Sequence, residues 1–418
     1  MNHFEPFCLT CQQPARDPNV LVCSSCGGAL GFRYDYTNVR WDDRYRSMWR
    51  YWRLLPVASV DHLATLGEGD TPLLPSRSYR QAQIYLKDET RNPTGSHKDR
   101  PLAVAVNHAL SLGATTSFVV SAGSTGISNA ALAARAGLRS VAIMSSGAPA
   151  ARVYPLFALG SQLLEVDGDI DALIAQVIDI CHTHGLYLSS TSRDSNPYQG
   201  EGAKTIAYEI FEQLGRVPDW MVVPVGGGGT LAAIWRGFLD LQALGRIDTL
   251  PKMVGVQPRD YNALEVAMQR GLETWDEVLA LDYSAAPPSV QVKLAHGHPP
   301  DGMEALDAVR ASGGLFLSVT DEEALDAQLR FSRGEGLYIE PSTGVVPAAL
   351  ERLLAEGQTR PDETVVALVC GGGFRETFLT LERRPLQSRL IQADELAQVL
   401  VELAESTAFK SNEVDSDQ

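Results

Sequence analysis

Apolar and polar positions alternate along most of the chain in a way that predicts strands followed by helices. Short apolar runs typical of buried strands lie at 84–87, 118–121, 140–144, 162–166, 220–225, 252–257 and 364–370. Stretches with helical spacing of apolar residues follow several of them, for example at 98–111 and 230–241. Because parallel strands are joined by helical crossovers and covered on both faces, this order predicts an α/β fold with mainly parallel sheets.

Three regions depart from this alternation. Residues 41–56 are rich in Trp, Tyr and Arg, which predicts an amphipathic helix that packs its aromatic rings on the main body. Residues 281–303 contain Pro, Gly and His and predict a long loop. Residues 386–418 predict a C-terminal helix followed by a polar, acidic and disordered tail.

Charge and hydropathy narrow the classes of function. Acidic residues outnumber basic ones by 51 to 35, which gives the 418-residue chain a net charge of −16. Such a charge disfavours nucleic acid and anionic membrane as main partners. No apolar run is long enough to cross a bilayer, and the N-terminal residues lack the basic and apolar regions of a secretory signal. We therefore expect a cytoplasmic protein.

The cysteines near the N-terminus have the spacing of a metal site. Cys8 and Cys11 form one C-x-x-C pair, and Cys23 and Cys26 form a second, with eleven residues between the pairs. Four thiolates suit a structural zinc ion, because they fill its tetrahedral coordination and leave no open position for catalysis. The alternatives are free thiols or a ribbon that has lost its metal. Cys181 lies on a helical apolar stripe and is expected in the core.

Lys98 lies between a predicted strand and a predicted helix, in the run Asn92-Pro-Thr-Gly-Ser-His-Lys-Asp-Arg100. A lysine held at a helix start and partly removed from water loses its proton more easily and can attack a carbonyl group. Taken alone, this run is equally typical of a surface lysine in a polar turn.

Two further loops join a predicted strand to a predicted helix. The first contains Gly226, Gly227, Gly228, Gly229 and Thr230, and its amides would converge on an anion at a helix N-terminus, as in a phosphate cradle. It has neither the G-K-[ST] of a P-loop nor a dinucleotide G-x-G-x-x-G pattern. The second loop, Ser121–Gly126, offers hydroxyls and amides for a carboxylate. A tight turn and a helix cap are the plainer alternatives for the two loops.

A reactive lysine, a phosphate cradle and a carboxylate cradle together suit pyridoxal phosphate acting on an amino acid. The lysine would bind the cofactor aldehyde, and the ring would accept the electrons released when the α-proton leaves. The amine that is freed when substrate displaces it could move that proton.

The chain resembles the threonine synthase-like members of the fold type II pyridoxal phosphate enzymes, in the tryptophan synthase β family. The motifs that carry the resemblance are Leu66–Leu73, Asn92–Arg100, Ser121–Gly126, Asn196–Gly202, Gly226–Thr230, Glu340–Gly344 and Cys370–Gly373. They span most of the chain. Some members of the family also have an N-terminal zinc ribbon, and the resemblance implies a homodimer.

The resemblance also implies a role for each motif. Lys98 would form the Schiff base with the cofactor, and Gly226–Thr230 would bind its phosphate. Ser121, Ser124 and Thr125 would face the substrate carboxylate and the 3′ oxygen of the cofactor. Cys370 falls where the family has a Ser or Thr beside the pyridine nitrogen, and a neutral partner there favours elimination and replacement over transamination.

Departures from the family pattern concern the substrate. Ser124 stands where the family has an Asn that touches the cofactor oxygen, and His97 stands where it has Phe. In the segment whose Ser and Arg help to hold a substrate phosphate, this chain has Asp194 and Gln199. Arg193 is a candidate to replace that Arg if it turns inward. The sequence alone does not decide whether the leaving group is phosphate or another group. His97, His296 and His298 are expected to be structural or exposed in loops.

These inferences combine into one prediction of organisation and function. We expect two three-layer domains and a small ribbon: zinc ribbon 1–35, large cofactor domain 36–104 and 194–385, small mobile substrate domain 105–193, and C-terminal helix and tail 386–418. The predicted function is elimination or replacement at the β or γ carbon of a small-molecule amino acid. The alternatives are a serine or threonine dehydratase and a cofactor-binding pseudoenzyme with a role in assembly.

Overall fold

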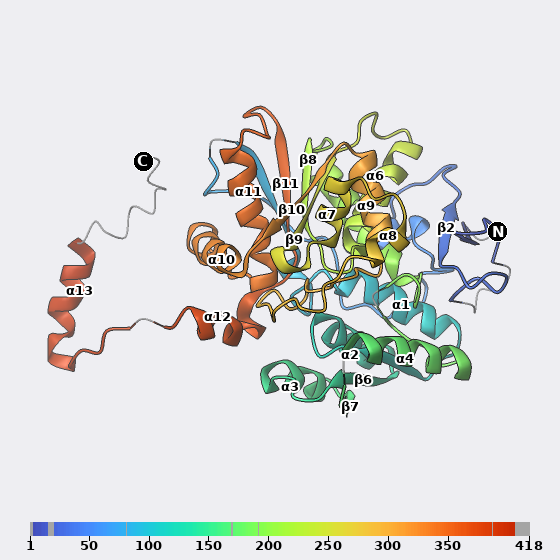
Figure 1. Cartoon of the computed structure of the whole chain (residues 1–418), viewed down its shortest axis with the longest axis horizontal. Coiled ribbons are helices and arrows are strands. Elements are labelled where there is room, and N and C mark those ends of the chain that lie inside the picture. Colours follow the sequence, from blue (N-terminus) through green and yellow to red (C-terminus); the bar gives the residue numbers. More distant parts are fainter. Residues whose placement is uncertain are drawn as a thin grey trace. The chain divides into compact units, whose positions relative to one another are not determined.

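A computed structural model describes residues 3–15, 21–80, 82–168, 170–190, 192–386 and 388–405 of the chain. The chain forms two compact units, Met1–Thr380 and Leu381–Gln418 (Figure 1). The first unit contains every strand and most of the helices. The predicted disordered tail lies largely outside the described residues.

The larger sheet of the first unit has six strands in the order β10-β9-β8-β11-β4-β3. Its strands are β3 (Leu73–Pro75), β4 (Gln83–Asp88), β8 (Trp220–Pro224), β9 (Lys252–Pro258), β10 (Leu315–Val319) and β11 (Thr364–Val369). All neighbours run parallel except β3 and β4, which are antiparallel. β8 and β11 are buried along their whole length, which explains why they read as unbroken apolar runs.

Helices cover both faces of this sheet. On one face Met221 and Val223 of β8 pack with α5 (Thr205–Leu214), α6 (Gly229–Ala243) and α9 (Gly302–Ala311). On the other face Val222 packs with α10 (Asp321–Glu335) and α11 (Val345–Ala355). Figure 1 shows the two groups of helices on opposite sides of the strands. The alternation along β8 therefore places the sheet in the middle of three layers.

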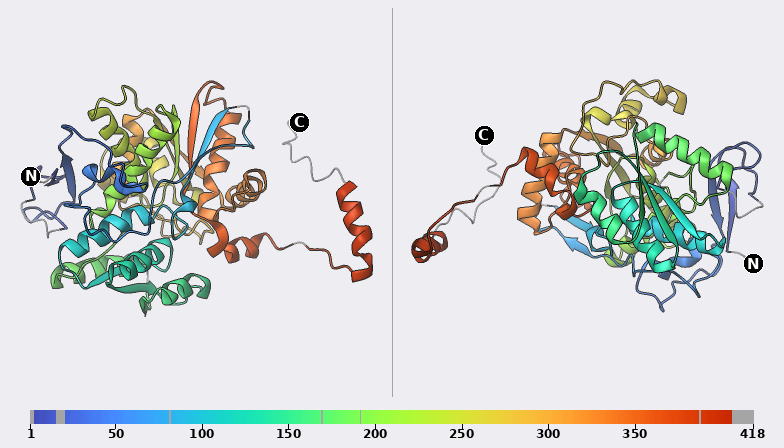
Figure 2. Two further views of the ribbon diagram at one scale, coloured as in Figure 1. Left: turned by 180° about the vertical axis from the view of Figure 1, so that it is seen from behind. Right: turned by 90° about the horizontal axis from the view of Figure 1, so that it is seen from below.

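The smaller sheet has three parallel strands, β5 (Thr116–Val120), β6 (Arg139–Ser145) and β7 (Gln162–Val166). Ala142 and Met144 of β6 pack with α2 (Ser124–Ala136) and α3 (Ala150–Ala158), whereas Val141 and Ile143 pack with α4 (Ile170–His184). Cys181 of α4 is buried in this second cluster, as predicted. The view from below in Figure 2 shows this sheet in teal between its helices.

The remaining elements are short or connect the two sheets. α1 (Asp99–Ser111) packs against α2 and so joins the two sheet regions. Near the N-terminus β1 (Phe4–Cys8) pairs with β2 (Leu30–Tyr34) in an antiparallel ribbon. The other helices are α7 (Ala263–Arg270), α8 (Trp275–Leu279), α12 (Thr377–Arg383) and α13 (Leu396–Glu405). Short 3₁₀ turns are η1 (Met48–Leu54), η2 (Glu89–Arg91), η3 (Gln199–Lys204), η4 (Arg259–Tyr261), η5 (Pro341–Thr343), η6 (Gly373–Arg375) and η7 (Ala393–Glu395).

The helix predicted at 41–56 is wrong for most of its length. Only Met48–Leu54 is helical, and it is a 3₁₀ helix. The side chain of Asp42 accepts from the backbone N of Arg44 and from Trp52 Nε1, and this favours a turn instead of a regular helix. The predicted packing does occur, because Trp49 is buried and donates to Glu68 Oε1 at 2.6 Å.

Two further sequence predictions concern the segment 281–303 and the C-terminal helix. The segment 281–303 forms a long connection, as predicted, and α9 begins only at Gly302. α13 of the second unit lies within the predicted C-terminal helix. Across the ranges given above, we find no helix with the length and apolar character needed to cross a membrane.

Candidate active site

A cavity of about 770 Å³ lies in the first unit, at the carboxyl ends of strands from both sheets. Val120 at the end of β5, Met144 of β6, Pro224 of β8 and Cys370 after β11 all line it. In parallel α/β sheets ligands bind in this position, since the loops that follow the strands gather there. The fold thus places the loops with candidate chemistry around one space.

The cavity brings together the predicted cofactor and substrate residues with one exception. Lining it are Lys98, Ser121, Ser124, Thr125, Gln199, Gly226, Gly227, Gly228, Gly229, Thr230 and Cys370. Arg193 is not among its lining residues. The four candidate metal ligands lie apart, in the N-terminal ribbon.

Lys98 precedes the first residue of α1 and lines the cavity. Burial lowers the pKa of its ammonium group from the ordinary value. The preceding loop is held by Asp99, whose carboxylate accepts from Thr94 N at 2.7 Å and from Thr94 Oγ1 at 2.6 Å. His97 lies against the carbonyl of Cys370, with Nδ1 at 3.2 Å from its oxygen. A lysine with a depressed pKa and a fixed backbone suits attack on an aldehyde.

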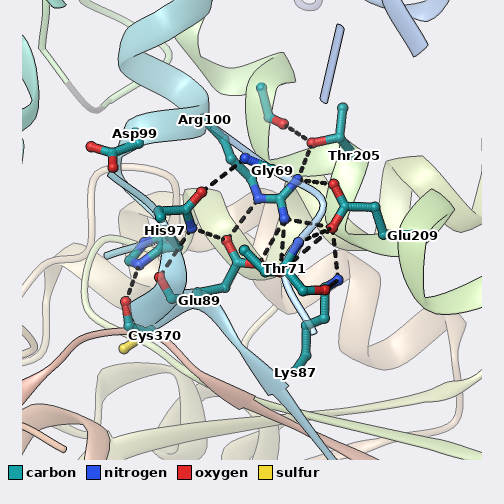
Figure 3. A network of polar contacts seen from close by, with 12 residues as sticks. Gly69, Thr71, Lys87, Glu89, His97, Asp99, Arg100, Thr205, Glu209 and Cys370 are labelled. Atoms are coloured by element: carbon teal, nitrogen blue, oxygen red, sulfur yellow. Dashed lines mark hydrogen bonds and ion pairs between the residues drawn. The ribbon is translucent and has the colours of Figure 1, made fainter. Parts of the chain in front are cut away.

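A buried network of charges fixes the first turn of α1 directly after Lys98 (Figure 3). Arg100 Nε donates to Glu89 Oε2 at 2.7 Å, and its Nη1 donates to Glu209 Oε1 at 2.6 Å. Lys87 Nζ forms an ion pair with Glu209 Oε2 at 2.7 Å. Burial tends to raise the pKa of Glu209, but Arg100 and Lys87 outweigh it and lower that pKa to about 2. The network carries two positive and two negative charges and is neutral as a whole.

The glycine loop fits a phosphate group. Gly228 has φ +95°, a conformation that residues with a side chain rarely adopt, and α6 begins directly after it. A Cβ at Gly226 would lie 2.5 Å from the carbonyl oxygen of Lys293, and a Cβ at Gly229 would collide with the carboxylate of Asp301. The loop therefore requires glycine at these positions. Its amides at the N-terminus of the 15-residue helix α6 form a site that favours an anion.

Cys370 presents a neutral thiol to the cavity. Burial, and then the carboxylate of Glu340, raise the pKa of this thiol to about 12. Its sulfur lies 3.0 Å from Thr343 Oγ1. The residue expected beside the pyridine nitrogen thus carries no charge at neutral pH.

Several cavity residues were not assigned a role from the sequence. His97, His296 and His298 line the cavity. His298 is exposed in the loop before α9, as expected, whereas the sequence did not place any of the three at the cavity. Burial, and then the charge of Lys98, lower the pKa of His97 to about 3, which keeps the ring neutral.

Charged residues also line the cavity: Arg152, Lys293 and Glu340. Glu340 lies in one of the recognised motifs, so its position had a signal in the sequence. Lys293 lies in the long connection 281–303, where nothing in the local pattern marks it.

Arg193 does not turn toward the cavity. It is 3% exposed, and its guanidinium group forms ion pairs with Glu201 at 3.1 Å and with Glu304 at 2.7 Å. Its Nη1 donates to the carbonyl of Leu30 in β2 at 3.0 Å. Two carboxylates and a carbonyl on the far side hold it there, whereas the neighbouring Asp194 lines the cavity.

The four cysteines of the ribbon gather at one point. The Sγ atoms of Cys8, Cys11, Cys23 and Cys26 all lie within 4.8 Å of one another. Cys8 Sγ is 3.5 Å from Cys26 Sγ, and Cys11 Sγ is 3.7 Å from Cys23 Sγ. These separations are too long for disulfide bonds. The cluster matches the predicted ligand set.

Comparisons with known proteins agree with this site. The profile of a family described as pyridoxal-phosphate dependent enzyme matches residues 64–371. The chain is 36% identical to a threonine synthase from Methanosarcina acetivorans, over 87% of this chain and 90% of that protein. It is 33% identical to a threonine synthase from Methanocaldococcus jannaschii, over 88% and 92% of the two chains. A crystal structure of O-ureido-L-serine synthase has the same fold, with TM-score 0.60, 22% identity and coverage of 78% and 96%.

The fold, the lysine and the glycine loop thus define a pyridoxal phosphate-dependent enzyme with mainly parallel α/β sheets. The chain belongs to that family, and within it to the threonine synthase-like enzymes. It is a lyase that eliminates or replaces a group at the β or γ carbon of an amino acid. The comparisons do not favour the two alternatives, an ammonia-lyase and a pseudoenzyme.

Proposed function

We propose that this enzyme performs a threonine synthase-type elimination and replacement on an amino acid whose leaving group is not a phosphate. The orientation of Arg193 is the observation that carries the second half of this proposal. The family's phosphate-binding Arg is Gln199 here, and the one nearby arginine that was a candidate to replace it is held by Glu201 and Glu304.

The residues around the cavity suit the following division of roles. Bound pyridoxal phosphate supplies an electron sink for the electron pair left at the α carbon. Lys98 Nζ would bind the cofactor and then hold the α-proton. The amides of Gly226–Thr230 would hold the cofactor phosphate, and Ser121 and Thr125 would hold the substrate carboxylate. Cys370, as a neutral thiol, would leave the ring nitrogen unprotonated.

Electrostatics around the side chain of the substrate support a leaving group of lower charge. Asp194 lines the cavity at the position where the family has a Ser. A phosphate ester with about two negative charges would lie near this carboxylate. The arginine that lines the cavity, Arg152, is already paired with Glu376 at 2.6 Å, and the family's Arg is replaced by Gln199. An ester without negative charge avoids this repulsion.

Initial rates on three substrates test the leaving group. The purified holoenzyme is given O-phosphohomoserine, O-acetylhomoserine or O-acetylserine, and the released phosphate or acetate, threonine and ketoacid are measured. We expect a higher kcat/KM for an acetyl ester than for the phosphate ester. Rapid formation of threonine and phosphate from O-phosphohomoserine would overturn the proposed leaving group, and ketoacid as the sole product would indicate an ammonia-lyase.

A double variant provides a matched test of the same pocket. Asp194→Ser combined with Gln199→Arg restores the family's residues at two cavity positions. We expect kcat/KM for O-phosphohomoserine to rise about tenfold or more, because one repulsive charge is removed and a bidentate partner is added. If the phosphate ester gains nothing while acetyl ester turnover is retained, these two positions do not select the leaving group.

We also propose that the ribbon binds a structural zinc ion through Cys8, Cys11, Cys23 and Cys26. A tetrahedron with Zn–S bonds of about 2.3 Å has sulfurs roughly 3.8 Å apart, close to the 3.5 and 3.7 Å between the two sulfur pairs. Metal analysis of purified protein should give one zinc per chain, and Cys11→Ser should lower that content. Full-length protein without bound metal that retains the same thermal stability would contradict the proposal.

By the family resemblance we propose a homodimer and a movable small domain near residues 105–193. The loop Ser121–Gly126 that follows β5 would approach the substrate carboxylate when this domain closes. Equilibrium sedimentation tests the dimer. Small-angle scattering with and without a bound amino acid tests closure, and an unchanged radius of gyration would count against it.

A further inference from the structure

Strand β2 of the N-terminal ribbon lies directly beside the cysteine cluster. The side chain of Leu30, the first residue of β2, is completely buried and packs with Cys8 and Cys23, two of the four candidate zinc ligands. Leu30 also pairs with Cys8 in the register of β1 and β2. The position of Leu30 therefore follows the folding of the cluster around it.

One face of β2 contacts the segment 193–201, part of which lines the cavity. The ring of Phe32 lies edge-to-face against Tyr198, with the ring centroids 4.9 Å apart. The hydroxyl of Tyr34 donates to Glu201 Oε2 at 3.0 Å. Because alternate residues of a strand share a face, these contacts belong to a single surface of the ribbon.

Arg193 continues this contact from the ribbon to the start of α9. Its Nη1 donates to the carbonyl of Leu30 at 3.0 Å. Its Nε forms an ion pair with Glu304, in the first turn of α9, at 2.7 Å. Its backbone N donates at 2.9 Å to Oδ1 of Asp301, the residue directly before α9. One buried arginine thus holds a carbonyl of the ribbon and the beginning of a helix at the same time.

The beginning of α9 in turn packs on the glycine loop. Asp301 N donates to the carbonyl of Gly227 at 2.8 Å. A Cβ at Gly228 would lie 2.6 Å from the carbonyl oxygen of Asp301, and a Cβ at Gly229 would collide with its carboxylate. Asp301 therefore forms the outer wall of the phosphate cradle, and its position constrains the loop whose amides would bind the phosphate.

We propose that the metal-bound ribbon holds the phosphate cradle in its binding conformation, with Arg193 as the positioning residue between the two sites. In a ribbon this small, metal binding and folding are one process, which gives two states. In the folded state the carbonyl of Leu30 holds Arg193, and in the metal-free state Arg193 loses this acceptor. Zinc should then raise the affinity for pyridoxal phosphate, and by linkage the cofactor should raise the affinity for zinc by the same factor. This coupling requires both groups to bind and is independent of the leaving group.

The first measurement uses the wild-type chain. Full-length apoenzyme is compared with and without zinc, which is removed by a chelator under reducing conditions, and the dissociation constant for pyridoxal phosphate is measured by equilibrium dialysis. We expect zinc removal to weaken cofactor binding about tenfold, since coupled sites typically affect one another by roughly 5- to 150-fold. Added zinc should restore the affinity. Competition with a chromogenic chelator should show that the enzyme without cofactor holds zinc less tightly by the same factor.

Arg193→Met tests the route of the coupling. With zinc present, this variant should bind the cofactor about tenfold less tightly, and zinc removal should then change the affinity by less than about twofold. Damage to the fold alone would weaken cofactor binding without removing its dependence on zinc. Arg33→Met is the matched control, because Arg33 is an exposed residue of β2 on the face opposite Phe32 and Tyr34. It should retain the full coupling.

Each outcome decides the inference. Zinc-bound enzyme whose cofactor affinity is the same after zinc removal would overturn the coupling and leave the metal site standing, whereas a chain that binds no zinc would overturn both. Full dependence on zinc in Arg193→Met would also overturn it. If that variant does not fold, Tyr34→Phe removes a single hydroxyl from the contact with Glu201 and should lower the coupling. No amino-acid substrate enters these measurements, so the three-substrate assay tests the proposed leaving group separately.

Discussion

Replacing Arg100 by Met tests whether the buried charge network supports the fold beside the catalytic lysine. Arg100 is completely buried, and its guanidinium group contacts both Glu89 and Glu209. Met has a similar apolar stem and fits the same space, so the variant mainly removes a charge and its hydrogen bonds. Lys87 remains to neutralise one carboxylate, which leaves one net negative charge in the interior.

The expected loss follows from that uncompensated charge. Breaking a buried ion pair by removing one partner typically costs 3–5 kcal/mol, so we expect the free energy of unfolding to fall by about 4 kcal/mol. Adding Glu89→Gln to Arg100→Met restores neutrality, because Lys87 then faces Glu209 alone. This double variant should recover about 2 kcal/mol.

Urea unfolding of the holoenzyme, followed by tryptophan fluorescence, measures these differences. Arg91→Met is the matched control: its side chain is 64% exposed and pairs with Asp88 at 3.2 Å, so its loss should cost less than about 1 kcal/mol. If Arg100→Met costs no more than this control, the network adds little to stability. A double variant that is less stable than the single one would refute the argument from charge balance.

Three further results are expected from the same structure. Lys98→Ala should abolish the visible band of bound cofactor and all turnover, as absorption and rate assays would show, and retained turnover would contradict its role. Gly229→Ala should weaken cofactor binding in equilibrium dialysis about tenfold, because the added Cβ meets the carboxylate of Asp301. Burial raises the pKa of Asp301 from 3.8 to about 7 in the folded state, so the folded state holds this proton more tightly. The free energy of unfolding should therefore fall as pH rises from about 4 to 7, and Asp301→Asn should reduce that slope in urea titrations.

Local patterns account for what could be predicted of the fold. β7 was predicted at 162–166 and has those bounds, and β11 was predicted to within one residue. Buried parallel strands are short and almost wholly apolar, so their signal is contained in their own residues. The segment 41–56 shows the limit of such patterns. Its aromatic spacing resembles a helix, yet Asp42 binds backbone and side chains nearby and the chain turns instead.

The candidate site also combines residues that lie in local sequence motifs with residues that no local motif marks. Lys98 and Gly226–Gly229 lie in short motifs at strand–helix junctions, and the structure places both on the cavity. The contacts of Lys293 reach Ser124, which lies 169 positions before it in the chain, and Glu376 on the other side. No window of the sequence contains that arrangement. It depends on how the connection before α9 passes between the two sheets.

Arg193 lies between the N-terminal ribbon and the loops that form the cavity. Its side chain donates to Leu30 in the ribbon, while its own backbone N donates to Asp301 beside the glycine loop at 2.9 Å. An arginine in this position links the N-terminal ribbon to the wall of the cavity and leaves Asp194 as the residue that lines the cavity. Turning Arg193 inward to bind a phosphate would break its pairs with Glu201 and Glu304 and leave two carboxylates without this partner. The cost of that rearrangement is the physical reason to expect a leaving group that needs no arginine.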